Sequence, residues 1–208
     1  MARPQRLTRE ESRAQTRERL LEAARQAFAR GGYGGASVDV IAADAGYTKG
    51  AFYGNFESKE AIFLELLARH KAAEAEQLDG LVSDGEDLET VLAKLDAWLA
   101  GMNADADWAL LAMELELHAR RSPSFAAAYD AINAGHQKRL GVLVERLFTL
   151  SGKRLPAPGV DLAVALMALA HGLVLNRPGQ KEPAASPGSL IGIVLRSLIA
   201  AAPEQRAT

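Results

Sequence analysis

The sequence predicts an all-α protein, and two observations support this fold class. Apolar residues recur at helical spacing in about nine segments, and a serine or threonine that can cap a helix precedes several of them. No internal repeat and no credible strand pattern interrupts this series. The 208 residues, 49% of them apolar, are enough to build one or two domains with a substantial core. We expect an N-terminal module of three helices followed by a larger helical region.

The first predicted helix takes in residues 17–30 and ends at Gly31 and Gly32. An earlier helical start is predicted at Thr8, which can form a capping box with Glu11. The apolar stripe of this helix consists of Leu20, Leu21, Ala24 and Phe28.

Residues 37–56 predict two short helices joined by a tight turn. Ser37 can cap the first helix, and Asp39 places negative charge in its first turn, where the helix dipole favours it. Gly46 supplies the turn, and Thr48 can cap the second helix. The buried stripe of the first helix consists of Val38, Ile41, Ala42 and Ala45. Such a pair is the helix-turn-helix unit, whose second helix normally lies in the DNA major groove.

The second of these helices has an apolar inner face and an unusual outer face. Phe52 and Phe56 lie four residues apart and face inward together. Gly50, Ala51 and Gly54 form the outer face, although glycine in a helix interior costs about 1 kcal/mol relative to alanine. Two glycines in one short helix indicate a backbone that must come close to something. The flanking donors, which suit phosphate oxygens, are Lys49, Tyr53 and Asn55.

At this point the segment closely resembles the TetR family of bacterial transcriptional regulators. The resemblance runs from about residue 16 to residue 62. It takes in the helix at 17–30, the GGY link at 31–33, the core SVDVIAADAGYTKGAFYGNF and the helix start ESKEAIF. The motif is long, ordered and ungapped, which makes it specific. The chain departs from the usual family pattern at Gly54 and Asn55, where members often carry a larger residue and a histidine.

The resemblance implies which residues contact DNA, mostly through phosphates. These residues are Ser37, Thr48, Lys49, Gly50, Tyr53, Asn55 and Lys59, to which the outer face of the second helix adds Ala51. The resemblance also implies that the rest of the chain binds a small effector.

A net charge of −2 is unusual for a DNA-binding protein until the chain is divided. Residues 1–30 contain eight Arg and four Glu, whereas residues 61–208 contain 14 Lys or Arg against 18 Asp or Glu. DNA binding requires a local basic face rather than a basic chain. The arginines stand beside the helix-turn-helix, where such a face is needed.

Composition excludes several other classes of protein. The absence of cysteine excludes disulfide and thiolate chemistry. The longest apolar stretch, residues 162–175, contains His171 and is shorter than the roughly 20 residues of a membrane helix. The N-terminus has no export signal, so we expect a cytoplasmic protein without membrane contacts. No nucleophile elbow, phosphate loop or dinucleotide fingerprint appears, and we expect neither enzymatic activity nor a cofactor.

Further helices are predicted through the C-terminal region. Ser58 can cap a long helix, and Ser122 followed by Pro123 can cap another. The later predicted segments are residues 88–99, 108–120, 125–150, 160–176 and 190–201.

Large apolar residues of the central helices are candidates for an effector cavity, with plain core packing as the alternative for each. They are Trp98, Met102, Trp108, Met113, Phe125 and Tyr129. Glu114 and His118 lie four residues apart on one helical face. A pair without a third ligand is weak evidence for a metal site, so we expect an acid–imidazole contact there and no metal.

The helix at 160–176 is apolar almost all the way round, and such a helix must be covered on every side. A strip of small residues that lets a partner helix approach consists of Ala165, Ala168 and Gly172. The last helix repeats an apolar stripe at Ile191, Val194, Leu195 and Leu198. We predict a homodimer with a four-helix contact across a twofold axis.

The sequence therefore predicts a homodimeric, two-domain transcriptional regulator, most simply a repressor. Residues 1–60 would bind a palindromic operator in double-stranded DNA, and residues 61–208 would dimerise and sense a small-molecule effector. The effector would act by binding better to the form whose reading heads are misplaced for DNA. Two alternatives stay open: a family-type DNA-binding protein controlled by a protein partner, and a helical ligand- or metal-binding protein with a vestigial DNA motif.

Overall fold

The computed structural model describes residues 8–83, 85–102, 106–176 and 187–205. In these ranges the chain forms nine α-helices, and its only strand-like feature is an isolated bridge between Lys153 and Glu204. The predicted all-α class is confirmed. The helices are α1 (Arg9–Gly35), α2 (Val38–Asp44), α3 (Lys49–Tyr53), α4 (Lys59–Asp79), α5 (Leu88–Met102), α6 (Ala106–Ala119), α7 (Pro123–Leu150), α8 (Gly159–Leu175) and α9 (Pro187–Ala201).

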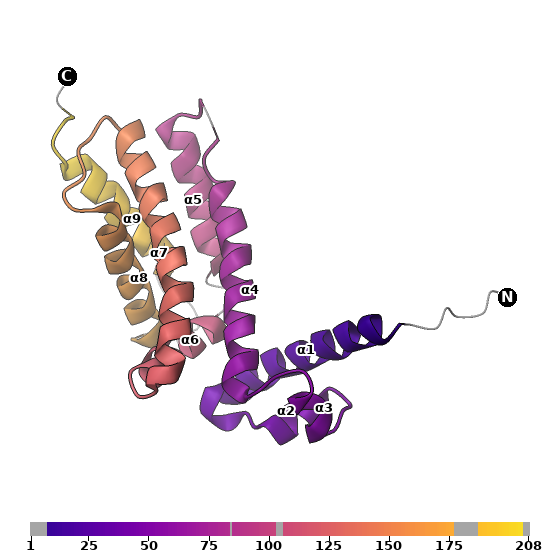
Figure 1. Ribbon diagram of the computed structural model, residues 1–208. Coiled ribbons are helices and arrows are strands. Elements are labelled where there is room, and N and C mark those ends of the chain that lie inside the picture. Colours follow the sequence, from indigo (N-terminus) through magenta and orange to yellow (C-terminus); the bar gives the residue numbers. More distant parts are fainter. Residues whose placement is uncertain (1–7, 84, 103–105, 177–186, 206–208) are drawn as a thin grey trace.

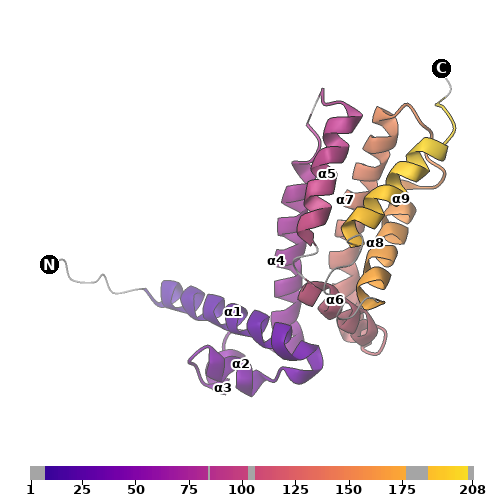
Figure 2. The same cartoon turned by 180° about the vertical axis from the view of Figure 1, so that it is seen from behind.

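The helices form two parts that α4 connects (Figure 1). At one end α1 projects sideways, with α2 and α3 lying beneath it. At the other end α5, α7, α8 and α9 stand side by side in an upright bundle, which Figure 2 shows from behind. The short helix α6 lies where the two parts meet, in contact with α1, α7 and α8. Its position makes α6 the bridge between the N-terminal module and the bundle.

Helix α1 begins with a capping box and contains a glycine kink near its C-terminal end. The capping box is confirmed, because Thr8 Oγ1 accepts from the backbone N–H of Glu11 at 3.1 Å and the Glu11 carboxylate accepts from the Thr8 N–H at 2.7 Å. The predicted break at Gly31 and Gly32 is also present, because the regular helix is interrupted by a kink at Gly32, and a short helical segment beyond the kink continues to Gly35. At the kink Gly32 has φ +65° and ψ −178°, a conformation essentially restricted to glycine.

Two apolar clusters hold the molecule together. The first contains the inner faces of α1 to α4, including Phe28, Phe52 and Phe63, and also Leu115 of α6 and Phe125 of α7. The second fills the bundle between α5, α7, α8 and α9. Because residues of α6 and of the start of α7 pack in the core of the N-terminal module, the stability of that module depends on residues far beyond the start of α4.

The helix boundaries agree with the predicted segments to within a few residues, with one local correction. Pro123 occupies the first turn of α7, as predicted, but the Ser122 side chain makes no capping hydrogen bond to that helix. The Ser122 hydroxyl lies 3.4 Å from that of Ser124 instead. Across the described ranges, no helix is both long enough and apolar enough to cross a membrane.

Candidate nucleic-acid interface and effector cavity

Short-range capping sets the geometry of α2 and α3. The Ser37 hydroxyl accepts from the Val40 N–H at 3.2 Å, and the Thr48 hydroxyl accepts from the Ala51 N–H at 3.2 Å. Gly46 takes φ +77° between the two helices, which lets the chain reverse within a few residues. Each cap satisfies one of the free N–H groups at a helix start. The predicted helix-turn-helix is therefore present, with α3 as its second helix.

Aromatic packing fixes α3 against the rest of the N-terminal module. Phe52 and Phe56 are both buried, and their ring centroids lie 5.8 Å apart. The Arg17 guanidinium of α1 lies 4.1 Å from the centroid of Phe56 and donates to the Asn55 carbonyl oxygen at 2.5 Å. The same guanidinium forms an ion pair with Glu65 of α4. The C-terminal end of α3 is thus attached to both α1 and α4.

The outer face of α3 is open. Tyr53 is 52% exposed, and its ring meets Phe52 edge-to-face at 5.5 Å. A Cβ added to Gly50 would come no closer than 3.7 Å to the atoms around it, and one added to Gly54 no closer than 3.5 Å. Neither glycine has positive φ. Neither internal packing nor backbone conformation therefore requires glycine at these two positions. A close approach of another molecule to this face of the backbone would require it.

Lys49 carries the exposed charge at the start of α3. Its ammonium pairs with Asp39 of α2 at 3.0 Å, and this hydrogen bond raises the pKa of Lys49. Both side chains are largely exposed, and ion pairs of this kind contribute little to stability. The ammonium can therefore exchange Asp39 for a phosphate at small cost.

Two of the predicted DNA-contacting side chains hold the module together in this structure. The Lys59 ammonium donates to the carbonyl oxygens of Tyr33 at 2.7 Å and Ala36 at 2.9 Å, and it lies 4.2 Å from the Tyr33 ring centroid. Burial lowers the pKa of Lys59. The Asn55 amide donates to the Ala51 carbonyl at 2.8 Å, while its buried Oδ1 has no hydrogen-bond partner. Ala51 itself is half-buried. Lys59 and Asn55 thus support the geometry of α1 and α3.

Two polar side chains of helix α6, Glu114 and His118, contact the N-terminal module. The Glu114 carboxylate accepts from the Tyr33 N–H at 2.5 Å, directly at the kink in α1. The His118 Nε2 lies 2.7 Å from Glu60 Oε1 at the start of α4. The predicted contact between Glu114 and His118 is therefore wrong: each side chain has a partner in the N-terminal module. Sequence patterns do not reveal these pairs, because the partners lie 58 and 81 residues apart.

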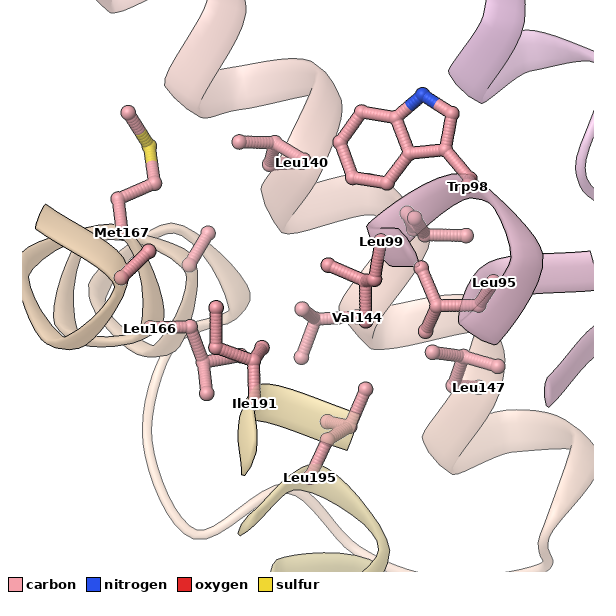
Figure 3. A pocket seen from close by; sticks show the side chains of 13 residues that line it. Leu95, Trp98, Leu99, Leu140, Val144, Leu147, Leu166, Met167, Ile191 and Leu195 are labelled. Carbon is pink, nitrogen blue, oxygen red and sulfur yellow. The ribbon is translucent and has the colours of Figure 1, made fainter. Parts of the chain in front are cut away.

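The bundle contains a cavity of about 80 Å³ between α5, α7, α8 and α9 (Figure 3). Its lining is entirely apolar. In Figure 3, Trp98 and Leu140 lie at one side, with Met167 beyond them, and Ile191 and Leu195 lie at the opposite side. The sequence analysis found the apolar stripes of these helices but could not tell which stripes enclose a space.

A buried polar cluster lies one helical turn from this cavity. On α7, His136 precedes the lining residue Leu140 by four residues, and on α8, His171 follows the lining residue Ala170. His136 is 5% exposed, its Nε2 lies 3.6 Å from Glu74 Oε2, and its Nδ1 has no hydrogen-bond partner. Burial lowers the pKa of His136 to about 4. At neutral pH this imidazole is uncharged.

Glu74 remains ionised at the centre of this cluster. Burial alone would raise the pKa of Glu74, but contacts with His70 and Lys71 outweigh it and lower that pKa to about 2. The Lys71 ammonium lies 2.8 Å from Glu74 Oε2. Among the residues that the structure describes, no group of three metal-ligating side chains is placed to hold a metal ion.

The predicted effector residues separate into two groups. Trp98 lines the cavity, and its indole N–H donates to Gln77 of α4 at 3.0 Å. Trp108 stacks on His70 at 4.3 Å instead and packs, with Phe125 and Tyr129, in the first apolar cluster. Met113 is half-buried on α6, and the side chain of Met102 lies outside the described residues. Of the five predicted effector residues whose side chains the structure describes, one, Trp98, lines the cavity.

The predicted dimer residues of α8 lie on an exposed or partly exposed face of the helix. Those of α9 are divided between a partly exposed face and the cavity wall. Ala165 and Ala168 are exposed and Gly172 is partly exposed. On α9, Val194 and Leu198 are half-buried. Ile191 and Leu195 do not belong to this surface, because they are buried and line the cavity of the bundle. Ile193, which is 56% exposed, takes the outward position instead.

Comparisons with known proteins agree with this geometry. The chain matches the family model of bacterial regulatory proteins, tetR family, over residues 20–66. The HTH-type transcriptional regulator YdgC of Bacillus subtilis is 30% identical over 132 residues, which cover 61% of this chain and 68% of YdgC. The HTH-type transcriptional repressor AcnR of Corynebacterium efficiens is 31% identical over 116 residues, which cover 55% of this chain and 56% of AcnR.

The fold is also that of solved regulators. The crystal structure of a TetR-family transcriptional regulator from Mesorhizobium loti aligns with a TM-score of 0.70 at 18% sequence identity. This alignment covers 93% of the present chain and 98% of that one. With the helix-turn-helix, the nine helices and these relatives taken together, the chain belongs to the TetR family of bacterial transcriptional regulators.

Proposed function

We propose that this TetR-family regulator is a repressor that binds a palindromic operator as a homodimer and leaves it when a small molecule binds. Residues 1–60 would form the DNA-binding domain, and residues 61–208 the domain that dimerises and senses the effector. Its relative AcnR is named a transcriptional repressor, which favours repression over activation for the present chain.

The open outer face of α3 is the observation that carries this proposal. Gly50 and Gly54 have room for a side chain, so their lack of one is best explained by a surface that approaches from outside the chain. Tyr53, 52% exposed beside them, can donate its phenol O–H to a phosphate oxygen. An exposed aromatic residue between two glycines suits a helix that docks closely into the major groove.

The other contacts would come mainly from the rim of this face. Ser37 and Thr48 place hydroxyls at the starts of α2 and α3, and Lys49 adds a charge. Lys59 uses two of its three donors on carbonyl oxygens, so the third is left for a phosphate. These groups contact the DNA backbone, so they would position the protein more than they would read bases.

The dimer would form through α8 and α9. Large apolar side chains that the single chain leaves exposed include Val160, Val164 and Leu169 on α8 and Ile193 on α9. The exposed Ala165 and Ala168 lie among them and permit close helix approach. A twofold axis through this surface would pair two α3 helices, so half-sites about 34–36 Å apart, or a multiple of that spacing, are expected.

Selection of bound sequences from a library of random genomic fragments tests the proposal. The expected result is enrichment of one motif with two inverted half-sites, bound by two copies of the chain. Light scattering on the purified complex measures that stoichiometry. Failure to enrich any sequence, or enrichment of an asymmetric site bound by one copy, would contradict the proposed function.

A further inference from the structure

We propose that Asp39 reads a cytosine in each half-site of the operator, by accepting a hydrogen bond from the N4 amino group in the major groove. This inference rests on the proposed function, because it names a base that the DNA-binding surface selects. From the sequence, Asp39 was expected only to place a favourable negative charge in the first turn of its helix.

Asp39 lies on the exposed side of α2, beside the start of α3. Ile41 and Ala42 of the same helix are buried, whereas the Asp39 side chain is 67% exposed. Its Oδ2 lies 3.0 Å from the Nζ of Lys49, the first residue of α3. In helix-turn-helix proteins the N-terminal residues of the second helix contact base edges. The ion pair therefore holds a carboxylate at the end of α3 that would enter the major groove.

A carboxylate on this surface is unsuited to the DNA backbone, because the phosphates are anionic and repel it. Lys49 offsets this repulsion at short range. An ammonium has three donors, so Lys49 can keep Asp39 as a partner while another of its N–H groups contacts a phosphate. The groups that remain for Asp39 in the major groove are the amino groups of cytosine and adenine.

The surroundings of these amino groups favour cytosine. The adenine amino group lies beside N7, whose lone pair would repel a carboxylate, whereas the cytosine amino group has a C–H group on that side. On its other side lies O6 of the paired guanine, an acceptor that suits an ammonium. The 3.0 Å between Oδ2 and Nζ is close to the base-pairing distance between N4 and O6, about 2.9 Å. Asp39 and Lys49 can therefore contact both bases of one C·G pair.

Operator variants in which each base pair of one half-site is replaced in turn test this inference. Fluorescence anisotropy measures the affinity of wild type and of Asp39→Ala for the whole set. In wild type, replacing the selected cytosine should weaken binding roughly fivefold or more, the usual cost of a mismatched pair. In Asp39→Ala the preference for cytosine should shrink at least about threefold at that position only, because one of its base contacts is lost.

A merely structural or repulsive role of Asp39 would give a different pattern. A loss of affinity for every sequence alike would mean that Asp39 only positions Lys49, and a gain for every sequence alike would mean that it only repels DNA. Either result, or an unchanged set of base preferences, would overturn the inference. Asp44→Ala is the matched control: this exposed acid on the same helix pairs with Arg30 of α1, so base preferences should stay as in wild type.

Asp39→Asn keeps the size of the side chain and gives a second test, which also decides if Asp39→Ala fails to fold. Asparagine pairs with adenine through N6 and N7, so the variant should accept adenine at the position where wild type selects cytosine. Discrimination against adenine as strong as in wild type would count against the inference.

The same measurements separate this inference from the proposed function. Failure of wild type to enrich any operator would defeat both. An operator bound by a dimer, with identical base preferences in wild type and Asp39→Ala, would defeat the reading of cytosine and leave the proposed function intact.

Discussion

The carboxylate of Glu114 on α6 accepts a hydrogen bond from the backbone N–H of Tyr33, at 2.5 Å, at the kink in α1. This contact joins a helix that touches the bundle to the segment that leads into the helix-turn-helix. A shift of α6 would therefore act on the orientation of α2 and α3. The effector proposed to bind in the bundle would therefore have a physical route to the DNA-binding face through α6.

Replacement of Glu114 by alanine should release the Tyr33 amide. A hydrogen bond to a charged acceptor contributes about 1.5–3 kcal/mol, so exchange of this amide should speed up by roughly 10- to 100-fold. Hydrogen exchange measured on a peptide spanning residues 31–36 reports the effect. Arg120→Ala, which removes an exposed pair with Glu116 on the same helix, should leave that exchange unchanged. Equal protection in Glu114→Ala and wild type would mean that the contact does not persist in solution.

Gly32→Ala should destabilise the protein by about 1–3 kcal/mol, because its backbone conformation is nearly exclusive to glycine. The added Cβ would also overlap the Glu114 carboxylate. Gly35→Ala is the matched control: it has no atom within 4 Å of the added Cβ and no positive φ. That substitution should be neutral or slightly stabilising. Urea denaturation measures both, and similar stabilities for the two variants would argue against the kink.

The buried His136 should make stability depend on pH. Its pKa falls from 6.5 in the unfolded chain to about 4 in the folded protein, chiefly through burial. Between these values only the unfolded chain binds the proton, so this contribution is complete above pH 6.5 and is lost as pH falls toward 4. The loss amounts to roughly 2–4 kcal/mol. His136→Leu should flatten the profile of unfolding free energy over this window. Superimposable profiles for variant and wild type would show that His136 does not titrate as described.

Glu74 affects stability in a lower pH window, which overlaps that of His136 only between about pH 4 and 4.5. Because the pKa of its folded form lies near 2, its stabilising contribution is present above pH 4.5 and declines as pH falls below that value. The two groups can therefore be distinguished in one pH series, since His136→Leu should leave the lower window in place.

Ala168→Arg should separate the subunits. Ala168 is exposed in the single chain, so the substitution should not disturb the subunit fold. In the proposed seam an unpaired charge would cost several kcal/mol. Light scattering should then report a monomer, and operator affinity should fall with the dimer content. Ala93→Arg, at an exposed alanine on α5, is the control. A folded Ala168→Arg protein that stays dimeric would place the interface on another surface.

Local features of this fold could be predicted from the sequence, whereas long-range pairings could not. The caps at Ser37, Thr48 and Ser58 follow from residues at most three positions apart, and all three are present. The inward placement of Phe52 and Phe56 follows in the same way from helical spacing. The contacts of Glu114 and His118 depend on how α6 docks, which no local pattern encodes.

Prediction of the cavity from the sequence is limited in the same way. Periodicity identified the apolar stripes of α5, α7, α8 and α9, but an apolar stripe looks alike whether it faces a core, a cavity or a partner. Ile191 illustrates this ambiguity, because it was predicted at the dimer surface and lies in the cavity wall. Trp98 lines the cavity, but the chemical grounds for predicting it applied equally to Trp108, which packs elsewhere.

The claim that α3 is the DNA-reading helix is tested most directly by the operator affinity of Tyr53→Ala. Fluorescence anisotropy with the selected operator should show about tenfold weaker binding at moderate salt, corresponding to one lost phosphate hydrogen bond. The dependence of affinity on salt should be unchanged, because tyrosine carries no charge. Leu117→Ala is the matched control, since Leu117 on α6 is 53% exposed and Tyr53 is 52% exposed. Wild-type affinity in a folded, dimeric Tyr53→Ala protein would contradict the account.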